Sequence, residues 1–130
     1  MAWTLYDYRD RRGENPVRRW CERLQKKDLA KMNQRIDLLE SNGHEFCPGL
    51  ASNLHGAPHL HKIRVNSNVA PRLFLCKGPI NMASEYTLLL GEFEKDDELP
   101  EGTLQLAESY RQEIINDPKN RRGLHERAKK

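Results

Sequence analysis

Three short apolar runs decide the fold of this 130-residue chain: LHGAPHLHKIRV at 54–65, APRLFLCK at 70–77 and EYTLLLGEFEKDDELP at 85–100. Each run is short and is bounded by turn-forming residues, which is typical of β-strands. Asn66-Ser67-Asn68 predicts a tight turn between the first two runs, and Gly78-Pro79 marks a longer loop before the third. We therefore expect the three runs to form an antiparallel meander.

The segments around the meander predict one more strand and three helices. Trp3–Tyr8 alternates in polarity and is rich in aromatic residues, so it is expected to be an opening strand. Asn15-Pro16 is a helix start, and Asn42-Gly43 ends the second of two helices. Thr103 is expected to cap a last helix through Asn116. The predicted fold is α+β, in the order strand-helix-helix-strand-strand-strand-helix, with the helices on one sheet face and the other face open.

Length and charge indicate one domain, at residues 1–118, followed by a basic and mobile tail at 119–130. The net charge is +3, but the charges are unevenly placed. Residues 1–27 hold eight Arg and Lys against four Asp and Glu, whereas residues 92–108 hold seven acids and a single Lys. This distribution predicts an anionic partner and a second, basic one.

The cysteines and the hydropathy pattern bear on the cellular compartment and on whether the chain binds a metal or a membrane. Cys21, Cys47 and Cys76 form no CxxC pair, so we expect neither a zinc site nor a disulfide framework. Cys21 and Cys76 each fall within an apolar pattern, so we expect them to be buried free thiols, which fits a reducing cytoplasm. The chain has no apolar run of membrane-spanning length, and its N-terminus lacks the apolar core of a signal peptide. We expect no metal, no other cofactor and no membrane partner.

Each of the three runs carries basic residues that packing in a core would not require: Lys62 and Arg64 in the first, Arg72 in the second and Lys95 in the third. Because side chains alternate along a strand, neighbouring strands with one basic face make a positive surface that suits a phosphate backbone. The alternative is that Arg64 and Arg72 are ordinary surface residues, paired with Glu92 or Glu94.

Metal-free RNA cleavage needs a base for the 2′-hydroxyl, a cation for the phosphoryl oxygens and an acid for the leaving oxygen. Arg72 is the first candidate for the cation, because its guanidinium stays charged and engages two oxygens at once. Arg64 is the second. Lys62 is a candidate for proton transfer, Lys95 for a further phosphate contact and His59 for general acid–base work.

The same surface predicts residues that bind nucleic acid without taking part in chemistry. Phe74 follows Arg72 by two residues and is a candidate to stack on a base, with a place in the core as the alternative. Lys77 ends the second run of the meander. Arg18, Arg19 and Arg23 lie off the apolar side of the first helix, where they either contact nucleic acid or are solvated.

Four short motifs, in this order, resemble the HigB-like, phage-derived branch of the RelE/ParE toxin superfamily. They are Gly13-Glu14-Asn15-Pro16-Val17, Leu60-His61-Lys62-Ile63-Arg64, Arg72-Leu73-Phe74-Leu75 and Leu89–Lys95, the last followed by Pro100 and a helix. The resemblance covers about residues 3–116. It implies a RelE-like fold and a metal-independent endoribonuclease that cuts mRNA on the ribosome and is neutralised by a cognate antitoxin.

The sequence departs from that family pattern at three places, and these departures favour a second, non-catalytic function as the alternative. Leu90 stands where the branch carries His, Glu94 replaces the first of two lysines, and Asp96, Asp97 and Glu98 make an acidic stretch. The alternative is a non-catalytic binding module of the same fold, such as a ParE-like toxin that inhibits gyrase.

Overall fold

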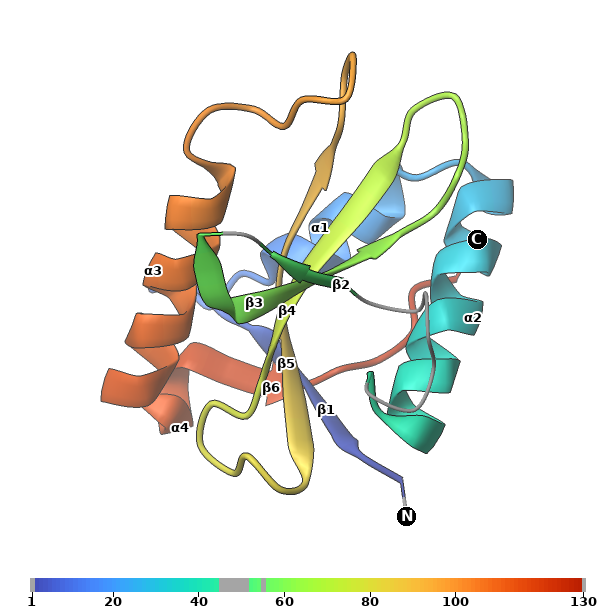
Figure 1. Cartoon of the computed structure of the whole chain (residues 1–130). Helices are drawn as coiled ribbons and strands as arrows, with labels where there is room; N and C mark the ends of the chain where they lie inside the picture. The colour runs from blue at the N-terminus through green and yellow to red at the C-terminus, as the bar shows by residue number, and fades with distance from the viewer. Residues whose placement is uncertain (1, 45–51, 55, 130) are drawn as a thin grey trace.

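The strands form one mixed, open sheet in the order β2-β3-β4-β5-β1-β6 (Figure 1). The computed structural model describes residues 2–44, 52–54 and 56–129. The strands are β1 (Thr4–Tyr8), β2 (Ser52–Leu54), β3 (Ala57–Arg64), β4 (Pro71–Lys77), β5 (Glu85–Phe93) and β6 (Arg122–Leu124). The helices are α1 (Pro16–Arg23), α2 (Lys26–Asn42), α3 (Thr103–Asn116) and α4 (Pro118–Arg121). The chain is thus α+β, as its sequence predicted.

The predicted antiparallel sheet is only partly right. Strands β3, β4 and β5 do form an antiparallel meander. Strand β1, however, runs parallel to β5, with Thr4 opposite Glu85, so the sheet is mixed. Its place between β5 and β6 is explained by its side chains, since Leu5 packs into the core on one face and Tyr8 into the core on the other.

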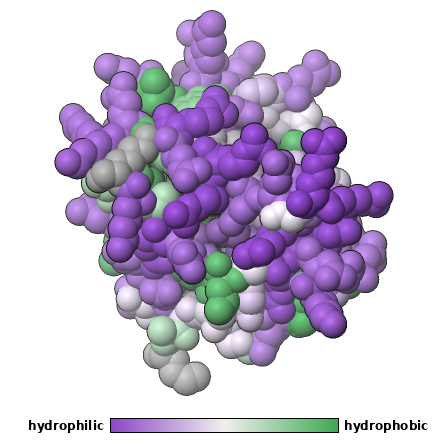
Figure 2. All heavy atoms as spheres, turned by 180° about the vertical axis from the view of Figure 1, so that it is seen from behind, coloured by the Kyte–Doolittle hydropathy of each residue, from purple (hydrophilic) through white to green (hydrophobic). Residues whose placement is uncertain are grey.

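Helices cover both faces of the sheet, which corrects the expectation of one open face. Figure 1 shows α2 and α3 on opposite sides of the strands. The cause lies in β4, where Leu73 and Leu75 pack under α1 and α2 while Phe74 and Cys76 pack under α3. A strand that is apolar on both faces needs a cover on each. Seen from behind, the surface is mostly hydrophilic, with hydrophobic groups only in separate patches (Figure 2).

Local signals account for the helix ends. The Asn15 side chain accepts a hydrogen bond from the Arg18 amide at 2.9 Å, and Pro16 opens α1. Gly43 ends α2 with φ at 75°, a conformation that glycine adopts without strain. Helix α3 begins at Thr103, but its cap position is Gly102, and the Thr103 hydroxyl donates to the Pro100 carbonyl instead.

The predicted element order lacks β2, α4 and β6. Strand β2 lies between α2 and the meander, in residues 44–58, whose two prolines and two glycines predict a connecting loop. Residues 45–51, which include Cys47, and residue 55 lie outside the described residues. Strand β6 pairs antiparallel with β1.

The C-terminal segment is not the mobile tail that its charge predicted. Ala128 is buried in the core beneath α1 and α2, and Arg127 pairs with Asp37 and Glu40 of α2. The His125 ring contacts the buried Asp7 carboxylate at 2.8 Å. Three of the basic residues that suggested disorder, Arg121, Arg122 and Arg127, therefore have acidic partners in the fold.

Candidate functional site

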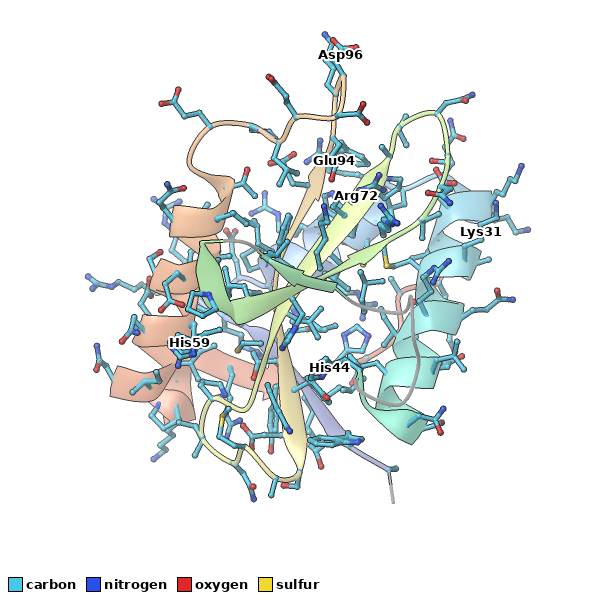
Figure 3. All side chains as sticks on the ribbon, viewed as in Figure 1. Lys31, His44, His59, Arg72, Glu94 and Asp96 are labelled. Atoms are coloured by element: carbon cyan, nitrogen blue, oxygen red, sulfur yellow. The ribbon has the colours of Figure 1, made fainter. Side chains whose placement is uncertain are left out.

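The meander brings Lys62, Arg64 and Arg72 onto one face of the sheet. Arg64 lies directly across from Arg72, and Lys62 lies across from Phe74, so all four share a face. This is the face on which α3 packs. Figure 3 shows Arg72 close to Glu94, which follows the end of β5. We call Lys62, Arg64, Arg72 and Glu94 the basic cluster.

Glu94 holds two of the three cations. Its Oε1 accepts from Lys62 Nζ at 3.0 Å and from Arg72 Nε at 2.9 Å. Partial burial alone would raise the pKa of this carboxyl. The hydrogen bonds and charges of Lys62 and Arg72 outweigh burial and hold the pKa below its ordinary value. Glu94 is therefore ionised at neutral pH and carries the negative charge of the cluster.

The Arg72 guanidinium is engaged within the protein. Besides Glu94, it donates through Nη1 to the carbonyls of Val65 and Pro71, at 3.0 and 2.9 Å. The residue is 8% exposed. Arg72 is thus not the open phosphate clamp that its sequence predicted, because its hydrogen bonds and its burial fix it between two strands and Glu94.

Arg64 is the exposed cation of the cluster. No ion pair of its side chain is found within residues 2–44, 52–54 and 56–129. Two guanidinium groups directly opposite each other on neighbouring strands repel, and Glu94 contacts only the one on Arg72. An anion bound at Arg64 would offset that repulsion.

Lys95 lies outside the basic cluster. It closes a tight hairpin, with backbone hydrogen bonds in both directions to Glu98, and Asp96 and Asp97 form the tip with φ of 54° and 63°. Glu94 points to the cluster, so the next residue along extended chain points the other way. The predicted role of Lys95 as a phosphate contact of the same site is not supported by this placement.

Phe74 belongs to the core rather than to a stacking platform. Its side chain is fully buried among Leu60, Cys76 and Ala107. A base cannot reach the ring without moving α3, so the alternative that the sequence left open is correct.

His59 and Lys77 border a different depression, which also involves His44, His61 and Arg111. His59 is exposed at the start of β3, and the Lys77 ammonium lies 5.3 Å from the ring centre of Trp3. His59 precedes Lys62 by three residues, about 10 Å along a strand, so it does not reach the contacts of Glu94.

The arginines of α1 are on the other side of the sheet. Helix α1 packs against the core that contains Leu73 and Leu75. Arg19 pairs with Glu14 at 2.8 Å, Arg18 lies near Glu22 and Glu126, and Arg23 lies over the Phe93 ring. Arg18, Arg19 and Arg23 therefore do not join the basic cluster.

Sequence reasoning named Glu94 as a departure from a family pattern and as an alternative partner of Arg64 or Arg72, but it missed that Glu94 pairs with Lys62 and Arg72 together. The available signal was its spacing. Glu92 is opposite Arg72, and Glu94 is two residues further along extended chain, hence on the same face.

The described part of the chain contains neither a group of side chains suited to a metal ion nor a helix suited to span a membrane. No group of three or more His, Cys, Asp or Glu side chains there is placed to hold a metal ion. None of the described helices combines the length and the apolar character needed to cross a membrane. Comparison with known proteins gives no family model that matches the chain and no curated protein that is similar to it in sequence.

Proposed function

We propose that this chain is the toxin of a type II toxin–antitoxin system of the RelE/ParE kind, and that it cuts mRNA on the ribosome without a metal ion. The supporting observation is the register pair Arg64–Arg72, with Lys62 two residues before Arg64 and one carboxylate, Glu94, among them. A positive group on rigid strands, with an ionised carboxylate beside it, suits a phosphodiester and its neighbouring 2′-hydroxyl.

In this proposal each group has one task. The Arg64 guanidinium binds the phosphoryl oxygens, since it is exposed, while Arg72 fixes Glu94. The Glu94 carboxylate accepts the 2′-hydroxyl proton as the 2′-oxygen bonds to phosphorus. The bond from phosphorus to the 5′-oxygen breaks, and Lys62 gives the 5′-oxygen a proton. The products are a 2′,3′-cyclic phosphate and a 5′-hydroxyl, and a proton passed from Glu94 to Lys62 over their 3.0 Å contact restores the site.

A non-catalytic toxin that binds a protein target is the second candidate. The burial of Arg72 favours it, because the best phosphate ligand of the cluster is already occupied by Glu94 and by two backbone carbonyls. Leu90 lies on the same face, across from Phe74, where the resembling toxins carry a His. Such a protein would arrest growth while leaving mRNA intact.

The test is to express the chain alone in a bacterium and to map the 5′ ends of mRNA. We expect new ends within translated codons. Arg64→Gln should lower their yield by about 100-fold, the effect of removing one charge-stabilising group from an active site. Lys119→Gln, an exposed cation on α4, is the matched control and should leave the yield unchanged.

Two results would overturn this proposal, one for the site and one for the activity. New ends that persist in Arg64→Gln would remove the basic cluster from the reaction. Growth arrest with intact mRNA and inhibited gyrase would favour the second candidate.

A further inference from the structure

A groove runs between α2 and the turn that joins β3 to β4. Two cavities of about 400 and 190 Å³ make it up, and they share Lys31 and Asn66. Lys27, Lys31 and Arg35 of α2 line one wall. Figure 3 shows Lys31 on the α2 side of the molecule, apart from Arg72 and Glu94. The groove is therefore distinct from the basic cluster.

The three cations form a row. Lys27, Lys31 and Arg35 are four residues apart, so they lie on one side of the helix with a rise of about 6 Å from each to the next. None of them makes an ion pair with any residue that the structure describes. Like charges at this spacing destabilise a helix. The row is thus a local cost to α2, although the Asp28 carboxylate lines the same cavity as Lys27 and Lys31.

The charges of α2 also oppose its helix dipole. Cations are stabilising near a helix C-terminus, yet Lys26 and Lys27 open α2 and no basic residue lies in its last turn. Asp28 is the one acid in the first turn, and it is buried and accepts a hydrogen bond from the Ser67 hydroxyl at 3.1 Å. Helix α2 thus carries like charges at an unfavourable spacing and cations at the wrong end of its dipole. Such local conflicts are expected where side chains serve a function and not stability.

The rest of the groove is rich in amide side chains. Gln34 of α2, Gln25 just before it, and Asn66 and Asn68 of the turn line it. Amides bond to phosphate oxygens and to sugar hydroxyls, and such contacts position a nucleic acid without reading its sequence. Among the residues that the structure describes, no aromatic side chain lines either cavity, so a strand here would be held by its backbone and not by stacked bases.

We propose that this groove binds the phosphodiester backbone of RNA, as a second contact beside the basic cluster; this inference rests on the proposed function. Asn66 follows Arg64 by two residues, so a strand that crosses the turn passes from the basic cluster to Lys31. An acidic helix fits less well, because such a partner needs a row of apolar anchors. The groove lacks such a row among its described residues: its apolar side chains Leu38 and Val69 line different cavities, and Val65 is only 1% exposed.

The test measures RNA affinity with two charge-matched variants. The first is Lys27→Gln/Lys31→Gln/Arg35→Gln. The second is Arg12→Gln/Lys119→Gln/Lys129→Gln, which removes three exposed cations outside the groove. The purified chain is titrated into fluorescein-labelled oligouridine at several salt concentrations. We expect the groove variant to bind about tenfold more weakly and the slope of log K against log salt to fall by about 2, the value for three lost contacts to a single strand. The control should keep the slope of the parent chain.

Equal losses in both variants would overturn the proposal, since net charge alone would then explain the binding. A labelled polyglutamate that binds the groove more tightly than oligouridine would overturn it in favour of an acidic protein. The proposed function fails separately: if the parent chain produces no new mRNA ends but the groove variant still loses affinity and slope, cleavage is excluded and the RNA groove stands.

Discussion

Glu94 sets how much positive charge the α3 face of the sheet presents. Its single carboxylate faces the ammonium of Lys62 and the guanidinium of Arg72, and all three side chains are less than one-fifth exposed. In such surroundings an ion that loses its partner costs more than the pair contributes, because the remaining charge stays poorly hydrated. The cluster is therefore expected to depend on Glu94 for its stability as well as for its geometry.

Replacing Glu94 tests this dependence. Glu94→Gln should lower the free energy of unfolding at neutral pH by about 2 kcal/mol, because Lys62 and Arg72 lose their counter-charge. Urea unfolding measures the change. Glu101→Gln, at an exposed position, is the control and should change little.

The effect of Glu94→Gln should also depend on pH. The pKa of Glu94 in the folded protein lies below its ordinary value of 4.5, so its contribution is complete above that value and is lost as the pH falls through the folded pKa. The difference between parent and variant should therefore shrink in acid. A difference that stays constant down to pH 2 would show that the charge of Glu94 is not what stabilises the cluster.

At the scale of elements, the C-terminal segment packs along α2 and is fixed there by hydrogen bonds and ion pairs. The Asn33 amide donates to the Ala128 carbonyl at 3.0 Å, and the His125 backbone amide donates to the Leu5 carbonyl at 2.9 Å. Ala128 is 3% exposed, so its methyl group closes the core under α1 and α2.

Substitutions at two neighbouring residues test whether the C-terminal segment is packed against the core or is a loose tail. Ala128→Glu should lower the free energy of unfolding by about 3 kcal/mol, because it places an unpaired carboxylate in a closed apolar site. Lys129→Glu, at the next and exposed residue, should change it by less than about 0.5 kcal/mol. Equal urea midpoints for the two variants would contradict the docking of Ala128.

Elements with their own end signals were predictable from the sequence. Asn15-Pro16 and Gly43 define where α1 starts and α2 ends, because a cap or a left-handed residue acts within one turn. The short strands were not predictable, since Ser52–Leu54 and Arg122–Leu124 carry no alternating pattern and form only because a longer strand lies beside them. For the same reason, the sequence placed Lys62, Arg64 and Arg72 on one face but did not show that Arg72 would be enclosed by Glu94 and two carbonyls.

At the scale of the whole molecule, two cores share one sheet. Cys21 lies in the core under α1 and α2, and Cys76 lies in the core under α3. Burial raises the pKa of each thiol to about 12, so both are protonated and enclosed at neutral pH. Because β4 contributes side chains to both cores, loss of one core should remove the support of the other.

Thiol alkylation tests whether the two cores unfold together. In a Cys47→Ser background, Cys21 and Cys76 should react with iodoacetamide at the same rate, with protection on the order of 10³-fold or more relative to the chain in urea. Peptide mass spectrometry measures each rate. Faster alkylation of Cys76 than of Cys21 would show that α3 opens by itself.

The position of β1 between β5 and β6 has a consequence for synthesis. Thr4 leaves the ribosome well before Glu85, the residue it pairs with on β5, and the other edge of β1 stays unpaired until Arg122–Leu124 have been made. Pairing over such separations makes folding slow. Leu5 and Tyr8 therefore emerge on an unpaired strand, and the sheet can be complete only once residues 122–124 have been made.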